Sequence, residues 1–215
     1  MNFQSFKKAY QNLWMKKLVK PPYKHVVQIG DPILRVKTKA VNPTDIESDN
    51  FKQFLETLKN VWSRYDCAGL SAPQIGVDLR VFAMHFPAVN KFRGTEQEYI
   101  NKEMQHVPYT VWINPEMKVI DYGKVSFSEG CESMRGYSAE VDRYTRVLLT
   151  GLNENGKATS CEYTGWPARI VQHEMDHLDG KIFTDIMKAR SLICDCWSRI
   201  NYHEGNIYLS YYPRK

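Results

Sequence analysis

The sequence predicts an α+β domain, with antiparallel strands in the middle of the chain and helices toward its ends. Three observations support this class. The chain has 215 residues, of which 43% are hydrophobic, which allows one sizeable core and favours a single catalytic domain. Short apolar runs bounded by turn residues, typical of strands, lie between residues 79 and 164. Apolar residues recur at helical spacing on either side of them.

The first 20 residues predict an amphipathic helix with one apolar face, surrounded by lysines. Organelle presequences are likewise basic and poor in acids, although they usually carry arginine and more serine than the single Ser5 found here. We therefore expect residues 1–22 to be a mitochondrial presequence. The alternative is an N-terminal helix of a mature cytoplasmic enzyme, and Pro21-Pro22 ends the helix in either case.

Residues 45–65 carry apolar side chains at helical spacing and predict a packed amphipathic helix. A loop containing Gly and Pro, residues 67–76 (CAGLSAPQIG), follows it. Residues 79–86 and 110–120 then predict two strands, with a polar insertion at roughly residues 90–108 between them.

Residues 143–152 and 157–164 predict a β-hairpin, because the turn sequence Asn-Glu-Asn-Gly separates them. Residues 165–178 predict a helix with Pro167 in its first turn and a glycine just beyond its end. We expect a second helix over residues 185–204.

The charge distribution argues against nucleic-acid binding. The net charge is +5, but residues 1–30 contain six lysines and no acid, and the rest of the chain holds 23 basic against 24 acidic residues. A basic surface that could follow phosphates is therefore missing. The apolar runs are also far shorter than the roughly 18 residues that span a bilayer, so we expect no membrane span.

The five cysteines are odd in number and irregularly spaced, which argues against a secreted disulfide framework and favours a reducing compartment. Cys194-Asp195-Cys196 has the spacing of a metal or redox pair. Because no second pair lies nearby, we expect two unpaired cysteines of the C-terminal helix, without a functional role.

The sharpest chemical feature is residues 173–177 (HEMDH) within the late helix. A spacing of four residues places the imidazoles of His173 and His177 on one helical face, where both can bind one ion. Trp166 and Ile170 extend the same stripe, so the pair should face the protein interior. This pattern predicts a metal-dependent hydrolase in which Glu174 moves the protons.

Catalytic sites of this kind use three protein ligands, and two residues compete for the third position. Glu204 follows His177 by 27 residues, as in metalloproteases with a distal glutamate, but it lies in a polar stretch. Cys131 follows a Glu-Gly pair that predicts a turn or strand end, and its thiolate is the stronger soft ligand for zinc or ferrous iron. We favour Cys131.

Three segments in the same order resemble the signature motifs of peptide deformylases: residues 69–74 (GLSAPQ), 129–131 (EGC) and 172–177 (QHEMDH). Bacterial members usually show G-x-G-x-A-A-P-Q and E-G-C-L-S. Here Cys67, Ser71 and Glu132 stand at three of the pattern's positions, and the departures resemble the animal mitochondrial type.

The resemblance runs from about Tyr23 to about Met187. It suggests a catalytic domain over residues 23–190, followed by a C-terminal helix and tail over residues 191–215. It implies antiparallel sheets packed around the central helix that carries HEMDH.

The resemblance implies hydrolysis of the N-formyl group from the formyl-methionine of nascent peptides, with release of formate. The cofactor would be one Fe²⁺ or Zn²⁺ ion, with Co²⁺ or Ni²⁺ as substitutes, held by Cys131, His173 and His177. A metal-bound water would be the nucleophile. Glu174 would take its proton and pass it to the leaving amine.

The resemblance also implies further site residues. The amide of Gln74 and the backbone N–H of Glu132 would donate to the oxyanion. Glu129 would hold Gly130-Cys131 or Gln74 in place, and the alternative is that it is an exposed acid. The substrate pocket would contain Gly69, Leu70, Gln74, Trp166, Arg169 and Ile170. Because bacterial enzymes have an apolar Leu where this chain has Glu132, we expect reduced activity or altered substrate preference.

Two other functions remain open from the sequence. One is a zinc endopeptidase with Glu204 as the third ligand, and the other is a decayed family member that serves as a metal-stabilised binding module. The expected partners are N-formylmethionyl nascent peptides and the exit region of the mitochondrial ribosome, where the enzyme would encounter them. Aromatic residues near the C-terminus predict either a homodimer interface, which we favour, or packing against the core: Trp197, Tyr202, Tyr208, Tyr211 and Tyr212.

Overall fold

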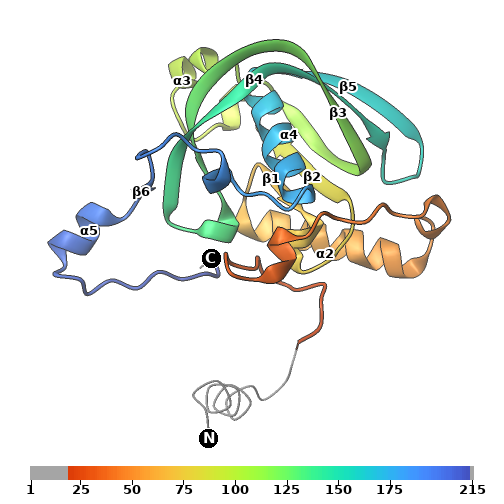
Figure 1. Cartoon of the computed structure of the whole chain (residues 1–215), viewed down its shortest axis with the longest axis horizontal. Helices are drawn as coiled ribbons and strands as arrows, with labels where there is room; N and C mark the ends of the chain where they lie inside the picture. Colours follow the sequence, from red (N-terminus) through yellow and green to blue (C-terminus); the bar gives the residue numbers. More distant parts are fainter. Residues whose placement is uncertain (1–18, 214–215) are drawn as a thin grey trace, which may run out of the picture.

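An antiparallel sheet wraps around one buried helix in the computed structural model, which describes residues 19–213 (Figure 1). The predicted N-terminal helix lies outside the described residues. In chain order the helices and strands are α2 (Asp49–Tyr65), β1 (Gly69–Ser71), β2 (Val81–Phe86), α3 (Glu96–Asn101), β3 (Val107–Gly130), β4 (Tyr137–Leu152), β5 (Ala158–Thr164), α4 (Gly165–Leu178), β6 (Ile193–Cys194) and α5 (Trp197–Tyr202).

The sheet has the strand order β1-β2-β3-β4-β5, and every neighbouring pair is antiparallel. The short strand β6 pairs separately with the start of β4. The predicted hairpin is present, since β4 and β5 pair from Arg146 opposite Thr164 to Leu152 opposite Ala158. These features confirm the α+β class and the sheet packed around a central helix.

Both faces of the sheet around β2 are buried, which explains the nearly continuous apolar run in that strand. Val81 and Ala83 point into a core cluster with α2, whereas Phe82 and Met84 point into a second cluster with α4. One strand therefore joins the two halves of the core.

The helix α2 has an amphipathic sequence and a side-chain cap. Its apolar stripe, which includes Phe54 and Leu58, is buried, and the Ser48 hydroxyl accepts a hydrogen bond from the Phe51 N–H. The predicted start at residue 45 was early, because residues 43–45 form a separate 3₁₀ turn.

The central helix α4 has the predicted bounds. Pro167 lies in its first turn, where no backbone donor is needed. Gly180 lies just beyond its end with φ of +72°, and an added Cβ would lie 2.8 Å from the carbonyl oxygen of Arg35. Only a glycine fits this stop.

Two predictions about the middle of the chain were incomplete. The segment expected to be a loop over residues 67–76 includes the strand β1, which pairs with β2, and a 3₁₀ turn over residues 72–75. The strand expected over residues 110–120 lies near the start of the longer β3, because pairing with β4 continues to Gly130. The polar insertion contains the short helix α3, capped by Thr95.

The predicted helix over residues 185–204 was wrong. This region holds a 3₁₀ turn at 183–185, the strand β6 and the six-residue helix α5. The backbone of Ile193 and Cys194 pairs with Ser138 and Tyr137 of β4 instead of continuing a helix. Local spacing does not reveal such long-range pairing. Among the described residues, no helix has the length and apolar content needed to cross a bilayer.

Candidate metal and catalytic site

Cys131, His173 and His177 converge, with one ligand atom of each within 4.8 Å of the others. The Sγ atom of Cys131 lies 3.2 Å from Nε2 of His177. A sulfur and two imidazole nitrogens at such spacing match three corners of a tetrahedral site for zinc or ferrous iron. These residues therefore fit the metal that the sequence predicts. Among the described residues, no other group of three or more His, Cys, Asp or Glu side chains has this arrangement.

The two histidines come from one face of α4, as their spacing predicts, and Cys131 comes from the end of β3. Gly130 is the last residue of β3, so the pairing of β3 with β4 delivers Cys131 to α4. Burial alone would raise the pKa of the Cys131 thiol, but the neighbouring imidazoles of His177 and His173 hold it well below its usual value. The site therefore favours a thiolate, the form that binds metal.

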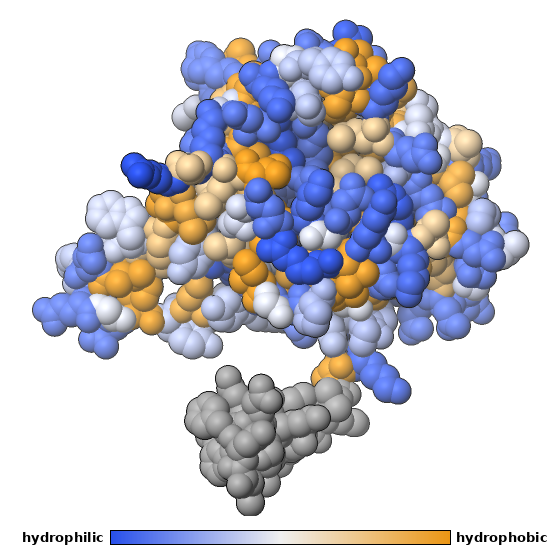
Figure 2. Space-filling view, in the orientation of Figure 1, coloured by the Kyte–Doolittle hydropathy of each residue, from blue (hydrophilic) through white to orange (hydrophobic). Residues whose placement is uncertain are grey.

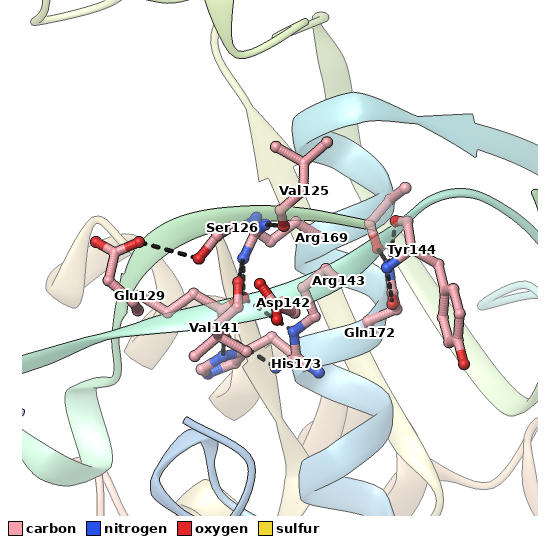
Figure 3. Close-up of polar contacts among 12 residues, drawn as sticks. Val125, Ser126, Glu129, Val141, Asp142, Arg143, Tyr144, Arg169, Gln172 and His173 are labelled. Carbon is pink, nitrogen blue, oxygen red and sulfur yellow. Dashed lines mark hydrogen bonds and ion pairs between the residues drawn. The ribbon is translucent and has the colours of Figure 1, made fainter. Parts of the chain in front are cut away.

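Glu129 contacts the imidazole of His173 within a buried ionic network (Figure 3). Its Oε2 atom is 3.0 Å from His173 Nδ1. Because a carboxylate only accepts, Nδ1 carries the hydrogen and Nε2 is left for a metal.

Two arginines complete the network around Glu129. Arg143 donates to both carboxylate oxygens at 2.9 Å, and Arg169 donates to Oε1 at 2.7 Å. Burial would raise the pKa of Glu129, but hydrogen bonds from His173 and Arg143 lower it well below the usual range. The network thus holds two arginines, and Asp176 supplies a second carboxylate. Its Oδ2 atom lies 2.5 Å from Arg143 Nη1.

Glu174 is buried beside the three ligand atoms, and its Oε2 atom has no hydrogen-bond partner within the described residues. Burial raises the pKa of this carboxyl to about 7, although the charges of His173 and His177 oppose the shift. A buried carboxyl with one unpartnered oxygen and a pKa near neutrality is suited to taking up and releasing a proton.

Gly69 makes room for that carboxylate. A Cβ added to Gly69 would lie 2.2 Å from Glu174 Oε1, closer than any stable contact. The first motif of the chain therefore needs its glycine because the carboxylate of the third motif packs against the Gly69 backbone.

The orientation of the Gln74 amide is fixed by Ser71. Gln74 Oε1 accepts from the Ser71 N–H at 2.8 Å and from the Ser71 hydroxyl at 2.9 Å. The amide nitrogen therefore faces the other way, toward Cys131 Sγ at 3.5 Å and Ser133 Oγ at 3.3 Å. A donor held in this direction can contact an oxygen that is bound next to the ligand atoms.

A cavity of about 320 Å³ opens onto these groups. Most predicted site residues line it: Gly69, Gln74, Glu129, Cys131, Glu132, Trp166, Arg169, Ile170, His173 and Glu174. His177 is buried directly behind it. Cys67 also lines the cavity, and burial raises the pKa of its thiol well above the usual value, so this thiol is neutral.

Two predicted candidates lie elsewhere. The Leu70 side chain is fully buried in the core cluster with α2 and does not line the cavity, because it alternates with Gly69 along β1. Glu204 is exposed and is not part of the metal-ligand group.

Three contributors were missed from the sequence. Arg143 and Ser133 carry no local motif, and only the fold brings them to Glu129 and Gln74. Asp195 reaches the cavity through the unpredicted strand β6. The Cys-Asp-Cys spacing was the only local feature of the sequence that drew attention to Asp195.

Comparisons with known proteins identify one family. The polypeptide deformylase family model matches residues 23–192. The mitochondrial peptide deformylase of Homo sapiens is 38% identical over 181 residues, covering 84% of this chain and 74% of that protein. Peptide deformylase 1A of Arabidopsis thaliana, chloroplastic/mitochondrial, is 36% identical over 166 residues, covering 77% of this chain and 62% of that protein.

The crystal structure of a peptide deformylase from Synechococcus elongatus in complex with actinonin has a TM-score of 0.64 and 30% identity. The match covers 81% of this chain and 84% of that one. The family model spans most of the chain, and the relatives align over the same region. This chain therefore belongs to the peptide deformylases, the metal-dependent hydrolases that remove the N-formyl group from nascent peptides.

Proposed function

We propose that this chain deformylates the N-terminal formyl-methionine of nascent polypeptides, with Cys131, His173 and His177 as ligands of a catalytic Fe²⁺ or Zn²⁺ ion. The observation that carries this proposal is the convergence of the three ligand atoms within 4.8 Å, at a cavity lined by the buried Glu174, whose Oε2 atom has no hydrogen-bond partner among the described residues. When bound, a divalent ion supplies a Lewis acid that activates water near neutral pH and polarises the formyl carbonyl.

Glu174 is the proposed proton carrier. Its carboxylate takes the proton of the attacking water and then delivers it to the amine of the leaving peptide. Burial raises the pKa of this carboxyl to about 7 in the metal-free chain, which strengthens it as a base toward water. Gly69 holds the backbone close to this carboxylate without blocking it.

Gln74 and the backbone N–H of Glu132 are the proposed donors to the developing oxyanion. The Gln74 amide nitrogen is directed toward Cys131, and the two hydrogen bonds from Ser71 prevent the amide from turning. Fixed donors of this kind contribute about 3 kcal/mol each in other hydrolases.

The methionine side chain is proposed to occupy the part of the cavity lined by Trp166, Arg169 and Ile170. The Arg169 guanidinium donates to Glu129 and to the carbonyl oxygens of Val125 and Val141, which fix its orientation.

Glu132 lies at the same cavity with its Oε2 atom 3.8 Å from Arg135 Nη1. Burial raises the pKa of the Glu132 carboxyl, although Arg135 opposes the shift. A partly desolvated carboxylate beside an apolar side chain weakens substrate binding. We infer that Glu132 reduces the activity of this chain on formyl-methionyl peptides, relative to a protein with Leu at that position.

The proposed compartment is the mitochondrion, since relatives from Homo sapiens and Arabidopsis thaliana have mitochondrial names. Residues 1–22 then serve as the presequence, residues 23–190 as the catalytic domain, and residues 191–215 as the C-terminal segment. N-terminal sequencing of the protein purified from mitochondria tests the boundary. An N-terminus at Met1 in the imported protein would contradict it.

The proposed assembly is a homodimer formed through the C-terminal arm, which we define as residues 191–213. The part of this arm around α5 extends away from the sheet in Figure 1, whereas its end returns to α2, where the Tyr65 hydroxyl donates to the Tyr211 carbonyl and the Tyr65 ring contacts that of Tyr212. Hydrophobic residues appear on the arm in Figure 2. Ile193, Trp197 and Tyr202 are 52%, 59% and 83% exposed. Analytical ultracentrifugation of the full chain tests this assembly, and a monomer at micromolar concentration would contradict it.

Formate release from formyl-Met-Ala-Ser tests the proposed activity. We expect the metal-loaded protein to release formate, and Cys131→Ser to lose both bound metal and activity. Glu204→Gln is the matched control and should retain both. Metal retention in Cys131→Ser together with metal loss in Glu204→Gln would contradict the ligand set and support an endopeptidase-type site instead.

A further inference from the structure

Cys194 and Cys196 form a close pair of free thiols. Their Sγ atoms are 3.4 Å apart, and both side chains are partly exposed. From the sequence we expected two unpaired cysteines on a helix. The structure instead places Cys194 on β6 and Cys196 at the start of α5, with a turn between them that brings the two sulfurs together.

The pair borders the mouth of the catalytic cavity. Cys194 lies opposite Tyr137 in the β6–β4 pairing. Asp195, between the two cysteines, donates its backbone N–H to the Gly136 carbonyl at 2.9 Å. The side chain of Asp195 accepts from the Ser138 hydroxyl at 2.6 Å. Gly136, Tyr137 and Asp195 all line the cavity, so the turn holding the dithiol is part of its wall.

We propose that Cys194 and Cys196 are a redox-active dithiol whose oxidation to a disulfide changes the shape of the substrate entrance. The oxidant is a small disulfide of the glutathione class. One cysteine thiolate attacks a sulfur of that disulfide, giving a mixed disulfide and one reduced thiol. The second cysteine then attacks the mixed disulfide, so that the intramolecular bond forms and a second reduced thiol leaves. Two protein thiols are oxidised, and one small disulfide is reduced.

Closing the bond brings the sulfurs from 3.4 Å to about 2.05 Å, the length of a disulfide. We expect this shift to move the intervening turn. Because that turn carries Asp195, and because the start of β4 is bonded to it, the cavity rim at Gly136 and Tyr137 moves too. The metal ligands lie on α4 and at the end of β3, so oxidation should change substrate binding more than the chemical step.

The test uses the metal-loaded enzyme incubated with glutathione disulfide, then alkylated and cleaved with trypsin. The peptide of residues 191–199 contains both cysteines and no other. We expect it to become two hydrogens lighter and unreactive to alkylation. In Cys196→Ser, the remaining Cys194 should instead carry one glutathione. Cys161, an exposed lone thiol on β5, is the internal control for disulfide exchange with solvent-accessible cysteines.

The kinetic arm rests on the proposed deformylase function, whereas the mass measurement does not, so the two can fail separately. We expect oxidation to change KM for formyl-Met-Ala-Ser by about threefold or more, with kcat within about twofold, the pattern of altered ground-state binding. The double variant Cys194→Ser/Cys196→Ser should not respond to the oxidant. A peptide that stays reduced while Cys161 is modified, or a disulfide form with unchanged KM, would overturn the proposal.

Discussion

Replacing Glu129 by Gln should weaken both the fold and the metal site, because this carboxylate faces His173 and two arginines at once. Glu129, Arg143 and Arg169 have side chains that are each only 5% exposed. Water therefore cannot replace the lost charge. The variant keeps the shape of the side chain, so the change isolates charge and hydrogen bonding.

The expected loss of unfolding free energy follows from the contacts that each arginine keeps in the variant. Breaking a buried ion pair costs about 3–5 kcal/mol. Arg143 keeps Asp176, whereas Arg169 loses its only carboxylate partner among the described ion pairs and keeps two backbone carbonyls. We therefore expect the lower end, about 3 kcal/mol. Loss of the carboxylate behind His173 should also weaken metal binding by about 10–100-fold.

Urea unfolding of the metal-free protein measures the first effect, and competition with a chelator measures the second. Glu98→Gln is the control, because Glu98 pairs with Lys102 on the exposed surface of α3 and such pairs contribute about 0.5 kcal/mol or less. If Glu129→Gln lowers the free energy of unfolding by no more than this control and leaves metal affinity unchanged, the role assigned to the network is wrong.

Three further substitutions test the catalytic geometry. Gly69→Ala should lower kcat by about 100-fold, because the new Cβ collides with the Glu174 carboxylate and displacing a reacting group by roughly 1 Å has about this effect. Unchanged kcat with normal metal content would contradict the packing of Glu174 against Gly69. Ser71→Ala removes one of two hydrogen bonds to Gln74 Oε1, so kcat/KM should fall about fivefold, equivalent to about 1 kcal/mol; Ser71→Thr should recover part of it, and no difference between the two variants would refute this role. Glu132→Leu should raise kcat/KM for formyl-methionyl peptides by about tenfold by removing a desolvated carboxylate, and unchanged turnover and KM would show that this side chain does not matter.

The parts of the site that local sequence predicted are those set by short-range geometry. Pro167 and Gly180 predicted the ends of α4, and a spacing of four residues placed His173 and His177 on one face. The soft-ligand argument for Cys131 identified a residue that the structure brings to the same point.

The parts that were missed depend on pairing between distant segments. Leu70 was expected in the pocket, but its position on β1 turns the side chain to the opposite face. The C-terminal helix was expected because nothing local indicates the two-residue strand β6, which exists only through pairing with β4. Arg143 has no motif, and its role follows from β4 lying beside both Glu129 and Asp176.

The proposal that three residues bind the metal while Glu174 moves the proton is tested most directly by measuring formate release by the Glu174→Gln variant at full metal occupancy. The proposed mechanism predicts that this variant binds one metal ion per chain with wild-type affinity and releases formate from formyl-Met-Ala-Ser about 10²–10⁴-fold more slowly, the usual contribution of a general base. Wild-type turnover by the metal-loaded variant would contradict the assignment of Glu174 as the group that moves the proton.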